Sequence, residues 1–293
     1  MPKVNLKTRD AVFAYSLIFP SLIIIIGTIG YPFAYAIWLS LLEKPIGGEA
    51  VFVGLKHFAD LIKDPFFLNS VKVTTLYMIG ALLGKFLLGL GIALYLNLRF
   101  RFRGVLRAIL MIPWALPWIT TALLWFWMYN YQLGLLNQIL DTLFGIKIVW
   151  LGPELALLSL ILIDIWKGTP FWAIVTLAGL QTIPQELYEA ASIDGAGAWQ
   201  RFRHITLPGI SGVLSILFCL SFVWAYMIFT PVYIITQGGP AFRTQSVVHR
   251  IYIELTGRHS FTYSSAMAVI MMPLFLTAII ILVMLFRRRG IRR

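Results

Sequence analysis

Six long apolar stretches constrain this chain more than any other feature. A helix needs about 20 predominantly apolar residues to cross the hydrocarbon core of a bilayer. The stretches that meet this requirement cover residues 11–42, 73–98, 108–129, 155–181, 210–236 and 264–286. Backbone groups in lipid have no water to bond, so such spans are helical. The sequence therefore predicts an all-α membrane protein with six transmembrane helices, organised as a single domain over residues 1–293.

The distribution of charge supports this class. Only 12% of the residues are charged and 59% are hydrophobic, whereas soluble chains carry about 25% charged residues. A formal charge of +12 can indicate a nucleic-acid partner, but the basic residues gather at the ends of spans and not along one polar face. Membrane topology explains that placement, so we expect a lipid bilayer and no nucleic acid as a partner.

The positions of Lys and Arg predict the orientation, because cytoplasmic segments are enriched in both. With the N-terminus inside, the cytoplasmic segments hold most of them. They are Lys3, Lys7, Arg9, Arg99, Arg101, Arg103, Arg107, Arg201, Arg203, Arg287, Arg288, Arg289, Arg292 and Arg293. The outer loop after the fifth span, with Arg243, Arg250 and Arg258, runs against this trend. We expect both termini and the segment 182–208 to be cytoplasmic.

The segment 182–208 is polar and rich in small residues between two apolar spans. Thr182 is a candidate N-cap, Gln185 lies three residues on as in a capping box, and Pro184 falls in the first turn. The helix should break at Asp194-Gly195, because Gly195 can adopt φ > 0 and Asp194 can cap the next helix. This second short helix should then run to about residue 204. Two short helices with a shallow, alanine-rich surface predict a docking element.

The chain carries no ATP-binding motif of its own. The nearest approach to a P-loop is Gly84-Lys85, but Ile79 and Phe86 stand where the motif needs Gly and Ser or Thr. ATP, if used, must therefore bind another chain.

The residues of segment 182–208 match a known loop in both identity and spacing. The pattern consists of Glu189, Ala190, Ala191, Asp194, Gly195, Ala196, Trp199, Phe202, Ile205, Leu207 and Pro208. It resembles the "EAA" loop of permease subunits from prokaryotic ABC importers, in the carbohydrate-uptake branch that includes maltose and glycerol-3-phosphate permeases. Further landmarks agree, among them residues 113–117, 134–137, 166–171 and 236–240, whereas His57 and Val73 depart from the Asn expected at those positions.

The resemblance implies the type I importer permease fold in a prokaryotic inner membrane. It also implies a sister permease subunit forming a heterodimer, two ATPase subunits that bind ATP and Mg²⁺, and an extracytoplasmic binding protein. This chain would then be non-enzymatic and hold no cofactor. Glu189 would bond to the ATPase cleft, Gly195 would make the bend, and Trp199 and Phe202 would anchor the loop. A capped turn without a docking role is the alternative interpretation.

Ionisable residues inside spans are candidates for a substrate path, because charge at the bilayer centre needs a partner or a water-filled cavity. Lys85 and Asp164 lie at similar depth in the second and fourth spans, so they can pair. The simpler expectation, which we favour, is that Asp164 pairs with Lys167 on the same helix and that Lys85 meets the partner subunit.

Aromatic and polar residues near Pro231 complete the predicted path. They are Trp224, Tyr226, Thr230 and Tyr233 in the fifth span. Aromatic rings stack against sugar C–H faces, and a proline-interrupted helix is tolerated where backbone lines a cavity. The four histidines show no metal-ligand spacing. The predicted solute is a sugar or oligosaccharide, and a self-sufficient ion-coupled transporter using Asp164 is the alternative function.

Overall fold

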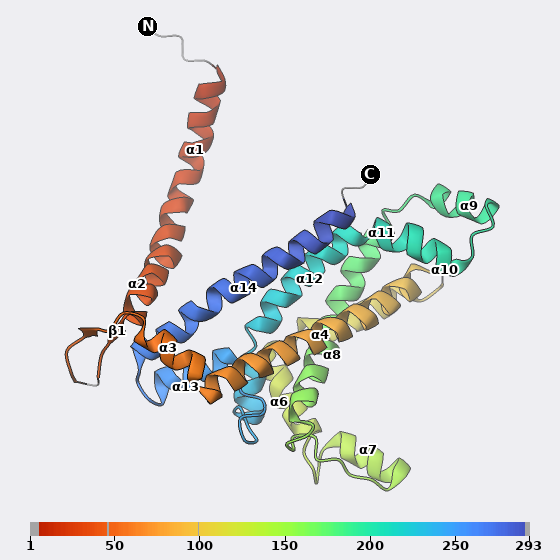
Figure 1. Cartoon of the computed structure of the whole chain (residues 1–293). Coiled ribbons are helices and arrows are strands. Elements are labelled where there is room, and N and C mark those ends of the chain that lie inside the picture. The colour runs from red at the N-terminus through yellow and green to blue at the C-terminus, as the bar shows by residue number, and fades with distance from the viewer. Residues whose placement is uncertain (1–5, 46, 99, 291–293) are drawn as a thin grey trace. The chain divides into compact units, whose positions relative to one another are not determined.

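The computed structural model describes residues 6–45, 47–98 and 100–290, and these residues are overwhelmingly helical (Figure 1). Among the basic residues that set the predicted orientation, Lys3, Arg99, Arg292 and Arg293 lie outside the described residues. The chain forms two compact units. Unit 1 comprises the described residues of Met1–Lys63 with Ile251–Pro273, and unit 2 comprises those of Asp64–Arg250 with Leu274–Arg293.

Unit 1 begins with a helical stretch at the predicted first span. It runs through α1 (Leu6–Ile25), the π-helix η1 (Ile26–Gly30) and α2 (Tyr31–Ser40). A short antiparallel hairpin of β1 (Leu42–Glu43) and β2 (Val51–Phe52) comes next, which the sequence analysis did not anticipate, and then α3 (Lys56–Lys63). Lys56 Nζ lies 2.7 Å from Glu43 Oε2, and this hydrogen bond and charge lower the pKa of Glu43.

Unit 2 contains most of the predicted spans. The long helices α4 (Pro65–Asn97) and α8 (Ala156–Leu180) each suffice to cross a membrane, as do residues 13–40 and 261–284. Two further spans are bent pairs. One consists of α5 (Arg103–Ala115) and α6 (Trp118–Met128), bent by 93°, and the other joins residues 198–209 to α12 (Ser211–Tyr226), bent by 64°. The described residues thus hold four straight candidate spans, or six with the bent pairs, and the predicted fold class is confirmed.

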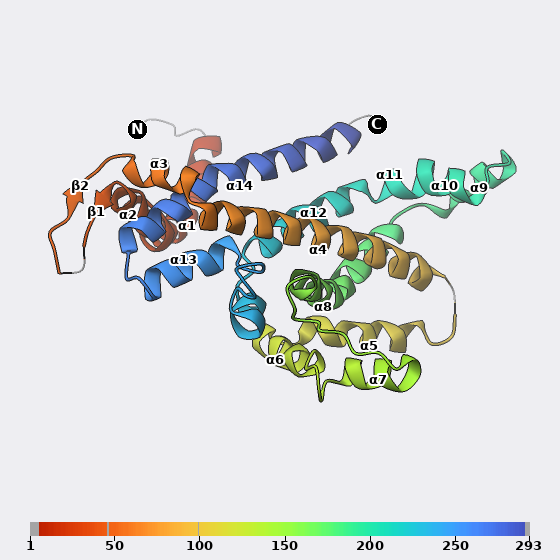
Figure 2. The same cartoon turned by 60° about the horizontal axis from the view of Figure 1, so that its bottom comes forward.

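The remaining elements of the chain are short, apart from the final helix. They are α7 (Leu135–Phe144), α9 (Gln185–Ile193), α10 (Ala198–Arg201), η2 (Phe202–Thr206), α11 (Leu207–Gly209), η3 (Val232–Thr236), α13 (Val247–Thr256) and α14 (Phe261–Gly290). Within unit 2, α8 runs from the α7 segment at one end to the α9 segment at the other (Figures 1 and 2). A single span therefore separates α7 from α9.

The closest packing in unit 2 joins α4 to α8. A Cβ on Gly84 would lie 2.2 Å from Ile165 Cδ1, and one on Gly89 would lie 2.5 Å from Trp172 Cβ. Only glycine lets the two backbones approach this closely. Two apolar clusters flank this contact. One contains Tyr77, Leu160 and Phe222, and the other contains Leu90, Trp172 and Leu217. Helices α4, α8 and α12 therefore form the frame that holds the residues described below.

Candidate functional site

The segment from α9 to α11, which we call the coupling segment, has the two-helix form that its sequence predicts. Helix α9 ends at Ile193, and Gly195 has φ +75°. The N–H of Ala196 donates to Ala191 O at 2.8 Å and closes the turn. Glycine is the residue that accepts this left-handed backbone without strain, so the predicted break at Asp194-Gly195 is confirmed.

The caps of the two helices differ from expectation. Thr182 Oγ1 donates back to Gly179 O at 2.8 Å, so Pro184 and not Thr182 is the N-cap of α9. Gly197, not Asp194, caps α10, and its N–H donates to Gln200 Oε1 at 2.8 Å. The second helix also continues beyond the predicted end near residue 204, through η2 and α11.

Two hydrogen bonds, which we call the brace, join α9 to the second helix. Arg201 Nη1 donates to Ser192 Oγ at 2.8 Å. The hydroxyls of Tyr188 and Thr206 lie 3.0 Å apart, and Thr206 is buried. The bonds span 9 and 18 residues, so they fix the angle between the helices. Tyr188, Arg201 and Thr206 were missed in the sequence because their role depends on partners that meet only after the bend forms.

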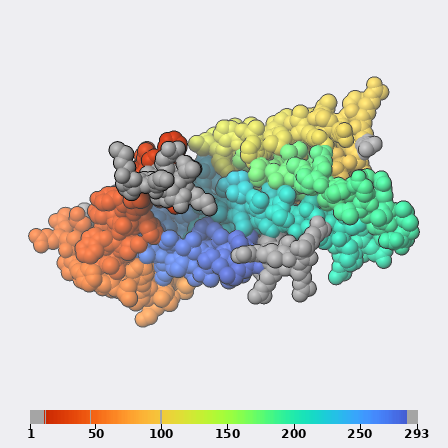
Figure 3. Space-filling model, turned by 90° about the horizontal axis from the view of Figure 1, so that it is seen from above, coloured from red at the N-terminus to blue at the C-terminus, as the bar shows by residue number. Residues whose placement is uncertain are grey.

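The coupling segment has an exposed outer surface (Figure 3, green to teal). Glu189 and Ala190 are exposed, Ile193 is 87% exposed and Trp199 is 68% exposed. Isolated side chains of this kind are ordinary, but two large apolar residues around a bend in a short segment indicate a contact surface. A hollow of about 360 Å³ inside the bend is lined by Ala191, Asp194, Gly195, Ala196, Gln200, Arg201, His204 and Ile205.

The inner side of the coupling segment attaches to unit 2. Phe202 and Leu207 pack against the apolar cluster of Leu90, Trp172 and Leu217. Pro208 lies in the first turn of α11. Trp199 contacts the ring of Phe202, with centroids 5.5 Å apart. The expectation that Trp199 and Phe202 both anchor the segment thus needs correction: Phe202 reaches the core, whereas Trp199 stays exposed because α10 turns it outward.

A cavity of about 480 Å³ lies between the spans of unit 2. Four of the six predicted path residues line it: Lys85, Asp164, Trp224 and Thr230. The others that line it are Trp114, Leu116, Pro117, Trp118, Lys167, Gly168, Trp172, Ser221, Met227, Ile228, Phe229 and Pro231. The remaining two predicted residues do not line it. Tyr226 packs on Phe275 with centroids 4.5 Å apart, and Tyr233 stacks on Phe229.

The charges at the cavity are paired across two helices. Lys85 Nζ lies 3.0 Å from Asp164 Oδ2, and their side chains are only 3% and 9% exposed. The favoured expectation that Asp164 pairs with Lys167 is therefore wrong, and the longer-range pairing is right. Gly168 makes the approach possible, because a Cβ there would lie 2.4 Å from Lys85 Cδ. Removing either residue of such a pair leaves an uncompensated buried charge, which strongly destabilises the folded protein.

Lys167 has a different role, which the sequence did not reveal. Its ammonium donates to the carbonyl oxygens of Pro113, Trp114 and Leu116 at the C-terminal end of α5. It also lies 5.2 Å from the centre of the Trp118 ring, at the start of α6. Unpaired carbonyls at a helix C-terminus carry partial negative charge and favour a cation. Lys167 therefore holds the corner at which the third span bends.

Interrupted helices and aromatic rings complete the cavity wall. Helix α12 ends at Tyr226 and η3 begins at Val232, so the predicted fifth span is broken beside Pro231. Ser246 Oγ donates to the freed carbonyl of Ile228 at 2.8 Å, as expected where irregular backbone lines a cavity. Trp114 stacks on Phe171 with centroids 5.5 Å apart, and Phe171 contacts Trp224. This wall offers aromatic faces, paired charges and backbone groups to a solute.

Known proteins are similar to this chain in sequence. The family described as "Binding-protein-dependent transport system inner membrane component" matches residues 85–291. The trehalose/maltose transport system permease protein MalF of Thermococcus litoralis is 41% identical over 245 residues, covering 83% of each chain. The sulfoquinovosyl glycerol transport system permease protein SmoG of Agrobacterium fabrum is 34% identical over 92% of this chain and 88% of its own.

A solved structure supports the fold. The chain superposes with a TM-score of 0.84 on one from a bacterial alginate ABC transporter in complex with an alginate pentasaccharide-bound periplasmic protein. The two are 21% identical, and the match covers 97% of each chain. Given the family match over residues 85–291 and the identity to full-length relatives, the chain belongs to the binding-protein-dependent transport system inner membrane components, the permease subunits of ABC importers.

Proposed function

We propose that this permease carries a sugar or oligosaccharide through the cavity between its spans. The names of its relatives support this class, because they refer to trehalose and maltose and to sulfoquinovosyl glycerol. The cavity wall supports it too. Trp114, Trp118 and Trp224 offer apolar ring faces, and the Lys85–Asp164 pair offers a donor and an acceptor to hydroxyl groups. A volume of about 480 Å³ falls within the ~300–1,000 Å³ typical of small-molecule sites.

The permease works, in this proposal, beside a sister permease subunit as a heterodimer. Two ATPase subunits beneath the pair bind ATP and Mg²⁺, and an extracytoplasmic binding protein delivers the solute. This chain then catalyses no reaction and carries no cofactor. Both termini and the coupling segment lie on the cytoplasmic side, in keeping with the cationic residues at those places.

The coupling segment is the proposed ATPase docking element. The exposed bend is the observation that carries this part of the proposal: Gly195 sets the turn, the brace fixes its angle, and Glu189, Ile193 and Trp199 face outward. ATP can shift the permease between inward-open and outward-open states only through contacts that differ between those states. A rigid bend whose inner side includes Phe202 and Leu207 can transmit such a difference to α8 and α12.

The test is reconstitution of the complete importer in proteoliposomes with a Glu189→Lys substitution. We expect ATP-driven uptake of the solute to fall at least tenfold, because a cation replaces a carboxylate at the docking surface. Glu186→Lys on the same helix, in its first turn, is the matched control and should retain uptake. Normal uptake by Glu189→Lys, with membrane insertion unchanged, would contradict docking at this surface.

The ion-coupled alternative makes a separate prediction. Uptake would then need no ATPase and would stop on addition of an uncoupler. The Asp164 carboxylate is already engaged by the ammonium of Lys85, so we do not adopt this function.

A further inference from the structure

Helix α7 divides into three faces, a pattern that neither the solute path nor the coupling segment requires. At 100° per residue, the helix turns one face toward the protein, where Asn137 is buried and Leu136 and Leu140 are half-buried. A second face carries polar side chains, and a third carries exposed apolar ones. A helix that merely filled a loop would need only the first two.

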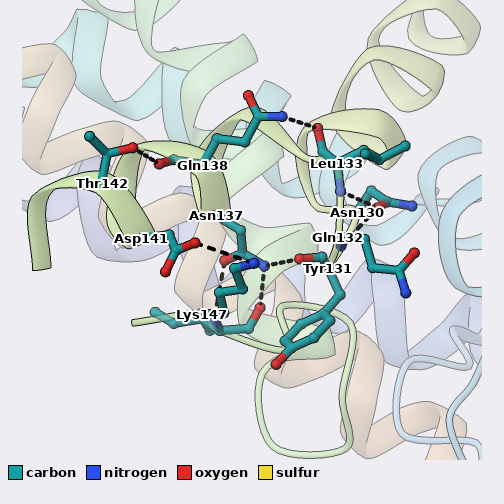
Figure 4. A network of polar contacts seen from close by, with 10 residues as sticks. Asn130, Tyr131, Gln132, Leu133, Asn137, Gln138, Asp141, Thr142 and Lys147 are labelled. Carbon is teal, nitrogen blue, oxygen red and sulfur yellow. Dashed lines mark hydrogen bonds and ion pairs between the residues drawn. The ribbon is translucent and has the colours of Figure 1, made fainter. Parts of the chain in front are cut away.

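The buried face is fixed firmly to the rest of unit 2. The amide nitrogen of Asn137 donates to Tyr131 O at 3.1 Å and to Ile148 O at 2.9 Å. Its amide oxygen accepts from Ile148 N at 3.0 Å and from Trp150 Nε1 at 3.1 Å. Figure 4 shows the Asn137 side chain at the centre of this network. With every polar atom of a fully buried side chain satisfied, α7 keeps one orientation.

The apolar face of α7 is exposed, although the helix itself is firmly held through its buried face. Leu135, Ile139 and Leu143 recur every four residues and are 52%, 46% and 66% exposed. Flanking residues extend this apolar surface, with Leu133 at 68% and Ile146 at 49% exposure. Because the Asn137 network fixes the rotation of α7, these leucines and isoleucines cannot turn inward.

The polar face borders the apolar face and carries no net charge. It carries Gln138, Asp141 and Thr142, all exposed. Asp141 Oδ2 lies 3.3 Å from Lys147 Nζ (Figure 4), so the two charges offset each other. A helix with one apolar and one polar exposed face lies naturally in the plane of a membrane interface, with its apolar side against the acyl chains.

The size and the surroundings of the apolar face indicate lipid as its occupant. A stable protein partner covers about 800 Å² on each side, far more than three side chains on a ten-residue helix can present. The α6 helix, which contacts α7, also carries exposed apolar side chains, with Leu123 at 48% and Trp127 at 63% exposure. Since α6 belongs to a candidate membrane span, its exposed apolar side chains are expected to face lipid, and α7 lies beside them.

We propose that α7 is an interfacial helix that rests in the lipid leaflet opposite the coupling segment. Leu135, Ile139 and Leu143 insert among the acyl chains, and Gln138, Asp141 and Thr142 face water. The contact does not depend on anionic lipid, because the polar face carries no net charge. It also holds the end of the third span, α6, which precedes α7 in the chain, at a defined depth.

Site-directed spin labelling tests the proposal on the assembled importer in phosphatidylcholine nanodiscs. In a Cys219→Ala background, which removes the single native cysteine, one cysteine is introduced at a time and carries a nitroxide. Ile139→Cys and Leu143→Cys probe the apolar face, and Gln138→Cys and Thr142→Cys are the matched controls on the same helix. All four positions are exposed, so the labels leave the core intact.

Collisions with dissolved oxygen report lipid, and collisions with a water-soluble nickel chelate report solvent. We expect oxygen to dominate at positions 139 and 143 and the chelate to dominate at 138 and 142, with at least a fivefold difference in the ratio between the two faces. Chelate access at 139 and 143 equal to that at 138 would overturn the proposal in favour of a solvated loop. Protection of 139 and 143 from both reagents would overturn it in favour of a protein partner.

Discussion

The coupling segment and the cavity are held together in opposite ways. In the coupling segment the bonded residues are 9 and 18 positions apart, and the surface side chains are exposed. At the cavity, Lys85 and Asp164 are 79 positions apart and almost fully buried. The coupling segment exposes a surface for the proposed contact with another protein, whereas the cavity contains a buried ion pair. Substitutions should therefore impair transport first in the coupling segment and stability first at the cavity.

The largest effect should come from breaking the buried ion pair. Lys85→Met leaves the Asp164 carboxylate without its cation, and removing one partner of a buried pair costs about 3–5 kcal/mol. We expect a clear drop in the apparent unfolding temperature of the purified permease, measured by thermal denaturation in nanodiscs. The double variant Lys85→Met with Asp164→Leu should recover much of the loss, because no unpaired charge remains.

The exchange variant, Lys85→Asp with Asp164→Lys, tests whether the contact between the two charges or the surroundings of each charge stabilises them. If the two side chains stabilise each other mainly by contact, the exchanged pair should be more stable than either single variant. An exchange as unstable as the single variants would show that the surroundings, and not the pair, fix these charges.

Corner variants of the third span should have the next largest effect. Lys167→Met removes the ammonium that donates to three carbonyl oxygens at the C-terminal end of α5. Hydrogen bonds to a charged group contribute about 1.5–3 kcal/mol, so we expect a smaller drop in unfolding temperature than for Lys85→Met. Lys167→Arg keeps the charge and should recover part of it. If Lys167→Met were as stable as the native chain, substitutions at the cavity would not act first on stability, and the contrast with the coupling segment would fail.

The two regions also differ in how far the sequence predicted them. The bend at Gly195 and the spacing of the loop motif are local, and a glycine followed by small residues suffices to predict them. The approximate positions of the spans could similarly be inferred from apolar length. The partner of Asp164 could not. Helical spacing placed Lys167 nearby, but the carbonyls freed by the bend at Leu116-Pro117 attract Lys167 away.

The same reasoning explains the errors among the aromatic residues. Trp224 and Tyr226 are two residues apart in the sequence and are both plausible cavity residues. The helix α12 turns Trp224 to the cavity and Tyr226 to Phe275, and only the packing of α14 decides between them. Trp114 and Trp118 lie at a helix corner whose 93° angle has no local signal beyond the two prolines.

A substitution series at Gly195 tests the other half of the contrast. The left-handed backbone costs an ordinary L-residue about 1–2 kcal/mol, and no neighbouring atom lies within 4 Å of an added Cβ. Gly195→Val should therefore reduce uptake about 5- to 30-fold through the angle of the bend, with little change in unfolding temperature. Gly195→Asn should be milder, because asparagine tolerates this conformation.

Gly197→Ala is the matched control for that series. Its φ is −68°, and the nearest atom to an added Cβ is Gln200 Oε1 at 3.8 Å. Native uptake is expected. If Gly195→Val and Gly197→Ala behaved alike, backbone angle at the bend would not be what the coupling segment needs.

The smallest effect should come from the brace, and it sharpens the contrast most. Ser192→Ala removes the acceptor of Arg201, an exposed hydrogen bond that contributes about 0.5–1.5 kcal/mol. Global stability should hardly change, yet the two helices gain freedom to move independently. We expect the number of ATP molecules hydrolysed per solute transported to rise roughly two- to threefold, measured on the same proteoliposomes.

Arg201→Gln should give the same result, and Ser192→Ala should add nothing to it in the double variant. Arg203→Gln, with the same loss of charge at a neighbouring position, should leave the ratio unchanged. A ratio that rises equally in Arg203→Gln would assign the effect to charge on this face and not to the rigidity of the bend.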